Sequence, residues 1–497
     1  MRFIDLTGKR VNLNQLRAQS LKFKPAGMDQ HVSMLRAYYS DCSAGLTLRR
    51  LEDLGMGVAG NRRPLEVGLM RWVIDQLAVA YSTPPNRWLV NSNGKRLAES
   101  NGNVRAMKQT LATSRYDLAW RMADRMRTLC GQAVLRFFAV DERSSVQVRV
   151  FTPDAVHRIP SSGIGDTMDC DEAFALDLSS GCEVWEREGA EWVCVWTDQN
   201  GRMLPPNKQP FAASGYVVPY ERLPVQVVYD GLSNGEAWVP PKATRLAAVE
   251  SVNVLLNEAL VLVQKQAHAS RFVTGARTDD VPAAAGPGVT TVLENVEARV
   301  FDLSPNPAIA DVVSFARESI RTFLRSEGLP ADSFEASARV LTGSALKAQM
   351  RELSERRRLA SVLAKEDERQ AWQRFVSVQS LHADAWGQTE LADLDLEVDL
   401  GAFDLPTDSR EVIDVAAREL ALGVASKVDV VCRTRNVSRE QALQILEQVK
   451  ADDELFGTSE VAPTLAQDGP KTAMPDPLTE THDSVIDAVN STQSEVK

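Results

Sequence analysis

Several motifs that would assign a chemistry to this chain are missing from its sequence. There is no Gly-x-x-x-x-Gly-Lys-Ser/Thr loop to hold nucleotide phosphates, and no Gly-x-Ser-x-Gly turn to present a serine nucleophile. The histidines form no paired metal-ligand motif; they are His31, His157, His268, His382 and His482. We therefore expect no cofactor, no metal site and no catalytic residue, and we expect the chain to be neither an enzyme nor an ATP-driven motor.

Cysteine is scarce, and no Cys-x-x-Cys pair occurs. The cysteines are Cys42, Cys130, Cys170, Cys182, Cys194 and Cys432. Six dispersed cysteines in 497 residues are typical of reduced thiols rather than of a disulfide framework. This usage fits a reducing cytoplasm.

The sequence also lacks an excess of positive charge and a long apolar run. Its 56 Lys and Arg against 67 Asp and Glu give a net charge of −11, which argues against a broad basic face that grips nucleic acid. The same charge is compatible with a channel through which DNA slides without adhering. No uninterrupted run of about 18 apolar residues occurs, and Met1–Arg10 has no apolar signal core, so we expect no membrane partner and no secretion signal.

Three polar patterns each allow two interpretations. Gly55–Gly60 matches the letters of the GxGxxG dinucleotide fingerprint, but a helical pattern precedes it where a strand is needed, which favours a turn. Arg356–Arg358 could contact phosphate, or could belong to a solvated or salt-bridged helix face. Four alternating acids could hold a cation or form the outer face of a half-buried strand; they are Asp393, Asp395, Glu397 and Asp399.

What the sequence does contain is a set of long helical patterns in the second half. Apolar residues recur at helical spacing from Leu246, interrupted by Asn253, which could set helix register against a neighbouring subunit or pack within one chain. Pro240 and Pro241 precede the pattern and Gly275 follows it, which predicts a helix over Lys242–Arg271, roughly 45 Å long at about 1.5 Å per residue.

A short region with strand character follows this helix, and two more helices come after it. Pro and Gly residues with β-branched runs at Val289–Leu293 and Val296–Leu303 predict a small strand-bearing lobe. Helical spacing returns from Ile309 and ends at Gly328 and Pro330. A polar loop over Ala331–Ser344 then leads into a charged helix over Ala345–Ala385.

The remaining segments are predicted from the same rules. We expect an arm at Met1–Lys24 and a mobile tail at Ser459–Lys497. We expect helices over Met28–Leu54, Arg63–Tyr81, Asn103–Cys130, Asp408–Leu422 and Ser438–Val449. We expect strands over Ala133–Val140, Ser145–Phe151, Cys182–Trp185, Trp192–Trp196, Val225–Tyr229 and Asp393–Leu400.

This order of parts resembles the portal proteins of tailed bacteriophages. The segment Leu341–Lys347 resembles the small-residue start of the family's last long helix, and Arg71–Pro85 resembles its early wing helix. Further similarities lie at Pro153 with Val156, at Leu223–Val225, and in the C-terminal helix pair around Ser438. The resemblance implies an α+β portal fold, assembled as a ring, with a wing, a long-helix stem, a small α/β clip and a helical crown.

On this resemblance the chain divides into ten consecutive parts. They are an N-terminal arm (1–27), the wing (28–241), stem helix 1 (242–273), the clip (274–307), stem helix 2 (308–328), the channel loop (329–344), a long wing helix (345–385), a wing strand (386–407), crown helices (408–458) and a disordered tail (459–497).

The family's function follows as an expectation from the same resemblance. It implies a dodecameric homo-oligomer at one capsid vertex of the virion, assembled in the host cytoplasm, through which double-stranded DNA is packaged and ejected. The implied partners are the terminase large subunit, a head-tail adaptor, and the major capsid and scaffolding proteins.

The resemblance also implies three groups of site residues. The DNA-channel loop would present Phe334, Ser337, Arg339, Thr342 and Ser344. The clip would present Arg277, Asp279, Asp280 and Glu294 to terminase or adaptor. The stem helix interface would contain Val249, Asn253, Leu256, Leu260 and Val263. The alternative is a non-viral helical oligomeric scaffold without a DNA channel; an enzyme would need a pocket of converging titratable groups that the sequence does not indicate.

Overall fold

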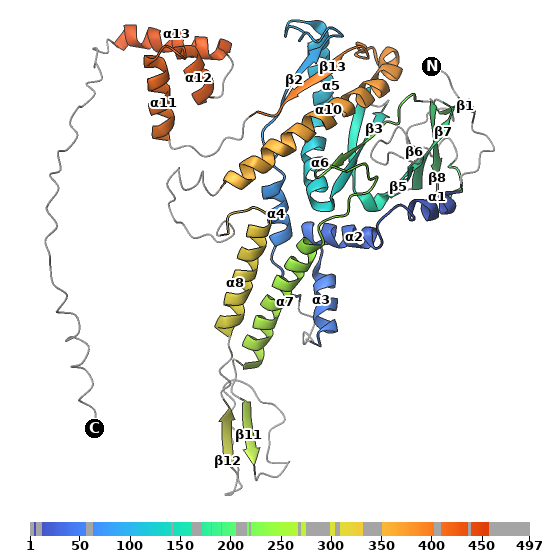
Figure 1. Cartoon of the computed structure of the whole chain (residues 1–497), viewed down its shortest axis with the longest axis vertical. Helices are drawn as coiled ribbons and strands as arrows, with labels where there is room; N and C mark the ends of the chain where they lie inside the picture. Colours follow the sequence, from blue (N-terminus) through green and yellow to red (C-terminus); the bar gives the residue numbers. More distant parts are fainter. Residues whose placement is uncertain are drawn as a thin grey trace, which may run out of the picture. The chain divides into compact units, whose positions relative to one another are not determined.

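The computed structural model describes most of the chain in two units. The described residues are 4–5, 12–55, 63–140, 143–160, 171–179, 181–189, 191–204, 216–217, 220–266, 270–274, 299–303, 309–331, 350–401, 409–435 and 439–456. The units are Met1–Pro406 and Thr407–Lys497, and helices and sheets both contribute, as the α+β prediction requires (Figure 1).

The first unit begins with helices that are shorter than the sequence patterns predict. They are α1 (Leu13–Ser20), α2 (Met28–Tyr39), α3 (Ala44–Asp53), α4 (Leu69–Leu77), α5 (Gly102–Thr113) and α6 (Tyr116–Cys130). The single helices expected over Met28–Leu54 and Asn103–Cys130 are each broken in two. Near the breaks, Asp41 and Arg115 have φ of 55° and 54°, in the left-handed region, which a continuous right-handed helix does not allow.

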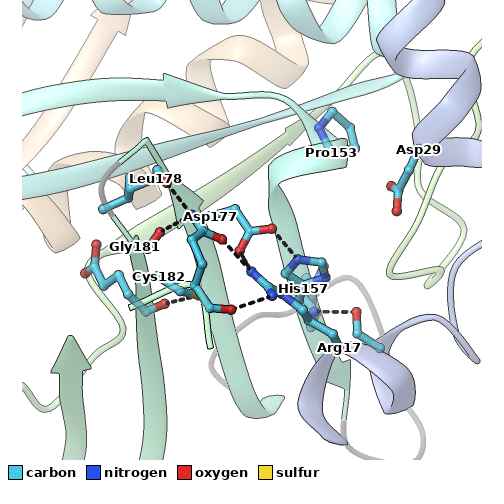
Figure 2. A network of polar contacts seen from close by, with 12 residues as sticks. Arg17, Asp29, Pro153, His157, Asp177, Leu178, Gly181 and Cys182 are labelled. Atoms are coloured by element: carbon cyan, nitrogen blue, oxygen red, sulfur yellow. Dashed lines mark hydrogen bonds and ion pairs between the residues drawn. The ribbon is translucent and has the colours of Figure 1, made fainter. Parts of the chain in front are cut away.

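The N-terminal residues are more than the arm that was predicted. Helix α1 buries Leu13 and Leu16, and strand β1 (Ile4–Asp5) pairs antiparallel with β9 (Tyr216–Val217). Arg17 of α1 and His157 both point at Asp177, at 2.5 Å and 3.0 Å (Figure 2). Burial opposes the ionisation of Asp177, but these two hydrogen-bond donors outweigh it and lower the pKa of Asp177 to about 2. The N-terminal helix is thus fastened to a sheet by charge.

That sheet has four antiparallel strands in the order β5-β6-β7-β8. Their bounds are β5 (Val156–Pro160), β6 (Asp171–Leu178), β7 (Gly181–Glu188) and β8 (Glu191–Thr197), with the short helix η2 (Pro153–Ala155) leading into β5. The hairpin β7–β8 contains both strands expected from Cys182 and Trp192, whereas the sequence patterns did not predict β6. The described cysteines, which include Cys182 and Cys194, form no disulfide.

A second sheet of three strands, β10-β3-β4, forms the centre of the first unit. Strands β3 (Gln132–Val140), β4 (Ser145–Phe151) and β10 (Val225–Tyr229) closely match their predicted bounds. On one side, Phe137 of β3 packs edge-on against Phe375, and Phe375 also contacts Tyr116 of α6. Next to Phe137, the guanidinium of Arg136 is buried and donates to Glu183 of β7 at 2.8 Å. The two sheets therefore share one core with α6.

A separate pair of strands contains the alternating acids. Strand β13 (Asp395–Asp399) pairs antiparallel with β2 (Asn86–Val90) and buries Leu396 and Val398. The acids on its other face pair with basic side chains; the pairs are Asp395 with Arg369, Glu397 with Arg96, and Asp399 with Lys365. Among the described residues no group of His, Cys, Asp and Glu is placed to hold a metal ion. The half-buried strand is confirmed, and its acids form an ion-paired outer face.

The long helices lie in the second half of the first unit. They are α7 (Ala243–Gln266), α8 (Ile309–Ser326) and α10 (Arg351–Trp386), and α7 lies beside α8 (Figure 1). Between α7 and α8 in the chain, β11 (Ser270–Thr274) pairs antiparallel with β12 (Arg299–Leu303). The first long helix therefore ends earlier than predicted, since Ser270 and Arg271 belong to a strand. Strand β12 lies within the predicted run Val296–Leu303, and Val289–Leu293 lies outside the described residues.

Helix α7 is long and apolar enough to cross a membrane, although polar residues interrupt its apolar run. By length and composition alone, Ala243–Val263 could cross a membrane, with a mean hydropathy of 1.7. A helix that packs inside a protein passes the same test, and Arg245, Asn253 and Asn257 of this stretch bond to other parts of the chain. The absence of a membrane partner stays a prediction.

The second unit contains three helices in its described residues. They are α11 (Ser409–Ala421), α12 (Lys427–Arg435) and α13 (Arg439–Phe456). Gly423 has a φ of 68° and follows α11 as its sequence position predicts. The sequence patterns did not predict α12, whose first turn is capped by a hydrogen bond from the Asp429 amide to Ser426 Oγ. The predicted tail lies outside the described residues.

Gly131 joins α6 to β3 at a point where the chain leading into α7 passes closely. Its φ is 82°, and a Cβ there would lie 2.7 Å from the carbonyl oxygen of Val239. We expect Gly131→Ala to cost about 2–4 kcal/mol of unfolding free energy, through both the left-handed backbone and the clash. Chemical denaturation of Gly94→Ala is the matched control, because Gly94 has a φ of 74° with no atom within 4 Å of its Cβ position. Equal losses in the two variants would contradict the close approach.

Candidate functional site

The predicted channel loop and clip residues lie outside the part of the chain that the structure describes. These are Phe334, Ser337, Arg339, Thr342 and Ser344 of the loop, and Arg277, Asp279, Asp280 and Glu294 of the clip. The described residues do show what holds the loop and the stem: the ends of α7, α8 and α10 with the segments they contact. We call this set of contacts the stem junction.

The two ends of segment 332–349 meet at the stem junction. Gly328, just after α8, has a φ of 74°, and a Cβ added there would lie 3.3 Å from a carboxylate oxygen of Glu352 in the first turn of α10. Leu329 and Leu353 beside them are 4% and 3% exposed, so both ends are anchored in the core. The described residues on either side of segment 332–349 therefore lie close together.

A buried ion pair joins the stem helices at the same junction. Arg245 in α7 donates from Nε and Nη2 to Glu327, at 3.0 and 2.8 Å, and from Nη1 to the carbonyl oxygen of Thr128 at the end of α6. The side chains of Arg245 and Glu327 are 1% and 3% exposed. Such a two-point guanidinium–carboxylate contact fixes direction as well as distance, so α6, α7 and the end of α8 are held in one arrangement.

The same contact determines the ionisation of Glu327. Burial on its own raises the pKa of this carboxyl, but the hydrogen bonds and charge of Arg245, with Lys242 at 3.4 Å, lower it below the ordinary value of 4.5. Glu327 is therefore ionised at neutral pH in the folded chain. Because its folded pKa is depressed, the stability it contributes is present above the ordinary value and is lost as the pH falls through the folded pKa.

The predicted stem interface residues divide into buried and exposed positions. Val249 and Asn253 are each 1% exposed and are enclosed by the chain itself, whereas Leu260 and Val263 are 38% and 42% exposed. Leu256 is half-buried between the two groups. Val249 and Asn253 are therefore packed within the chain. The stem-interface prediction stays a prediction, and Leu260 and Val263 on the outer half of α7 are its accessible positions.

Asn253 has a partner within the chain that explains its place on an apolar stripe. Its Oδ1 accepts the amide of Val67 at 3.2 Å, while Asn257 accepts the amide of Leu65 at 2.8 Å and donates to the Leu65 carbonyl at 2.7 Å. These bonds hold the segment before α4 extended. This is why the helix predicted from Arg63 begins only at Leu69.

Helix α10 leads from the stem junction across the three-stranded sheet, with buried polar contacts spaced along it. Arg357 donates to the Leu400 carbonyl at 3.1 Å, and Arg374 donates to the Leu223 carbonyl at 2.8 Å. Between them the fully buried Glu368 accepts from Arg87 and from the Tyr81 hydroxyl. Each contact is charge-assisted and specific in position, so α10 cannot slide along the sheet without leaving charges unpaired.

The arginine triplet is explained by these contacts. Arg357 is 2% exposed, Arg356 pairs with Asp230 at 3.3 Å, and Arg358 pairs with Glu355 at 2.9 Å. The salt-bridged interpretation is confirmed for Arg356 and Arg358. Arg357 is not available to phosphate.

The pairing of Arg245 with Glu327 was not predicted from the sequence, although one signal was present. Arg245 lies on the same helical stripe as Val249 and Val252, and a charge on a stripe of buried residues implies a buried partner. Nothing in the sequence identifies Glu327 as that partner.

Removing the buried cation provides a direct test of the stem junction. We expect Arg245→Ala to cost about 3–5 kcal/mol of unfolding free energy at pH 7, because it leaves Glu327 buried without its main partner. The loss should shrink as the pH falls below the ordinary carboxyl value of 4.5 and Glu327 becomes protonated. Denaturation of Arg358→Ala, which breaks an exposed pair, should leave the midpoint nearly unchanged. An equal loss in both variants would show that the junction is not specially stabilised.

No protein-family model matches the chain, and no curated protein matches it. Among solved structures, one from the neck of an empty GTA particle (C6 symmetry) has a TM-score of 0.44 at 12% identity, covering 78% of this chain and 92% of that one. One from the neck of a native GTA particle (C12 symmetry) has 0.43 at 11%, covering 73% and 88%. One from the virion of a native gene transfer agent (GTA) particle has 0.40 at 13%, covering 78% and 98%. All three TM-scores are below 0.5.

Proposed function

We propose that the chain is the subunit of a ring-shaped portal, a channel for double-stranded DNA at one vertex of a viral capsid. The observation that carries the proposal is the stem junction, where the described residues that flank segment 332–349 lie together beside the joined ends of α7 and α8. A loop held in this way can project into a channel without weakening the fold that holds it.

The outer parts of the stem helices support assembly. Leu260 and Val263 on α7 and Phe315 on α8 are 38%, 42% and 62% exposed, on helices whose other sides are packed against each other. Apolar side chains left uncovered on paired helices favour burial against another protein surface. In the proposed ring they contact neighbouring copies, up to a dodecamer.

The charge of the chain supports passage of DNA rather than its capture. A net charge of −11 disfavours a tight grip on phosphates, so DNA can move while a separate motor performs the work. Under this proposal the chain itself catalyses no reaction. Phe334, Arg339 and Thr342 of the channel loop touch or gate the DNA during packaging and ejection.

The partners follow from the same role. The clip between α7 and α8 docks the terminase large subunit and later a head-tail adaptor, and the wing meets the major capsid and scaffolding proteins. The ring assembles in the host cytoplasm and ends in the virion.

The mass of the purified particle is the first test of this role. Native mass spectrometry with negative-stain images should find a closed ring of about a dozen copies around a central hole, because exposed stem positions on each copy need a neighbour. A stable monomer or dimer at high concentration, with and without scaffolding protein, would contradict the ring and favour the helical scaffold.

The channel loop can be tested separately, because its ends lie together. Replacing Asp332–Thr342 with a short Gly-Ser linker should leave the number of copies in the ring unchanged, since Gly328 and Glu352 still lie close together. In a packaging reaction with the matching terminase and procapsids, nuclease-protected DNA should fall several-fold. Unchanged packaging and retention of DNA would remove the proposed role of the loop. A full-length ring purified in parallel is the control.

A further inference from the structure

The described residues of the second unit form helices but bury almost no side chains. In the described parts of Ser409–Phe456, Ala442 is the one residue whose side chain is buried. Seven large apolar side chains of this unit are exposed; they are Ile413 (64%), Val415 (44%), Leu420 (37%), Leu422 (77%), Val424 (77%), Leu443 (44%) and Val449 (46%). Five others are half-buried; they are Val428, Val430, Val431, Ile445 and Leu446. Soluble units do not leave this much of their apolar content in water without a covering surface.

The helices are nevertheless well specified by their local sequence. Ser426 caps α12, Gly423 ends the turn after α11, and Arg433 pairs with Glu419 at 2.7 Å across the α11–α12 connection. Helices of 13, 9 and 18 residues are marginal in water on local interactions alone, and helical segments are stabilised mainly by burying an apolar face. The second unit therefore has the start and stop signals of a helical domain without the buried face.

The charges of the second unit indicate what covers that face. Helix α12 and the start of α13 carry Lys427, Arg433, Arg435 and Arg439; of these, Arg433 pairs with Glu419 and Arg439 pairs with Asp429. In the sequence, the later part of α13 carries Glu447, Asp452, Asp453 and Glu454 beside Lys450. No ion pair of Arg435 or of Glu447 occurs among the described residues. Unlike charges at two places on one unit match each other when two copies meet head to tail, and this type of contact closes into rings.

We propose that the second unit completes its core against the second unit of a neighbouring copy. The basic end around Arg435 faces the acidic half of the neighbour's α13 around Glu447, and the exposed leucines and valines are buried between them. Folding of this unit is thereby coupled to assembly of the chain. The inference rests on the proposed ring for the presence of a neighbour.

Cross-linking of the full chain tests the contact directly. Unlabelled and ¹⁵N-labelled chains are mixed before assembly and treated with an amine-reactive cross-linker, which reads Lys427 on α12 and Lys450 on α13. We expect cross-links between Lys427 of one isotope and Lys450 of the other. Cross-links of this pair confined to single chains would overturn the proposal, as would cross-links from Lys427 or Lys450 to the first unit alone.

Amide hydrogen exchange of the same samples tests the coupling of folding to assembly. Amides of α11–α13 should exchange at least about tenfold more slowly in the assembled particle than in the monomeric chain, while those of α6 and β3 are protected in both. Equal protection of α11–α13 in the monomer would show that the chain covers its own helices and would overturn the proposal.

Charge-reversal variants distinguish a specific contact between the second units from nonspecific association. Arg435→Glu and Glu447→Arg should each lower the assembled fraction and the α11–α13 protection, and the double variant should restore both. Arg105→Glu, an exposed reversal on α5 of the first unit, is the matched control. A ring that forms in every variant with unchanged protection would refute this contact and leave the portal proposal intact. A wild-type chain that remains monomeric would refute the portal proposal, and protected α11–α13 amides in that monomer would refute this one as well.

Discussion

The bond network of Arg245 is the constraint on which the first unit depends. One guanidinium joins the end of α6, the start of α7 and the end of α8, and it does so without access to water. A buried charge of this kind is costly unless every donor is used, so the three helix ends can be arranged in few ways. The stem therefore takes its direction from the core of the molecule rather than from contacts along its own length.

Helix α10 extends this constraint from the stem junction to the rest of the first unit. Its start touches Gly328, and its later turns bond to the segments before β10 and after β13. A change at the loop is thus connected to the sheets by one rigid element whose polar contacts do not tolerate sliding. In the proposed portal, this is the physical property that the channel loop needs if DNA is to press on it while the ring stays intact.

Sequence periodicity predicted the elements whose stability is local, and it failed where distant residues decide. Strands β4 and β10 have their predicted bounds, because alternation and turns define them. The late start of α4 could not be predicted, since the side chains that hold its leading segment extended come from Asn253 and Asn257, 186 and 192 residues away. The helix breaks at Asp41 and Arg115 could not be predicted either, because no Gly or Pro stands at these positions. Likewise, the Glu327 partner of Arg245, 82 residues away, could not be predicted from the sequence.

The two units differ in how much of their apolar surface they bury. In the first unit, fully buried Trp120, Trp185 and Trp372 fill a continuous core, so an isolated copy can fold before it meets a partner. In the second, capped helices present their leucines and valines to water, and stability has to come from another surface. In the proposed ring, a subunit built in this way folds its first unit early and orders its second unit only when neighbours arrive. Under the proposed contact, premature association through the second unit is weak, because that unit is incomplete until a neighbour on the correct side supplies both the apolar cover and the opposite charge.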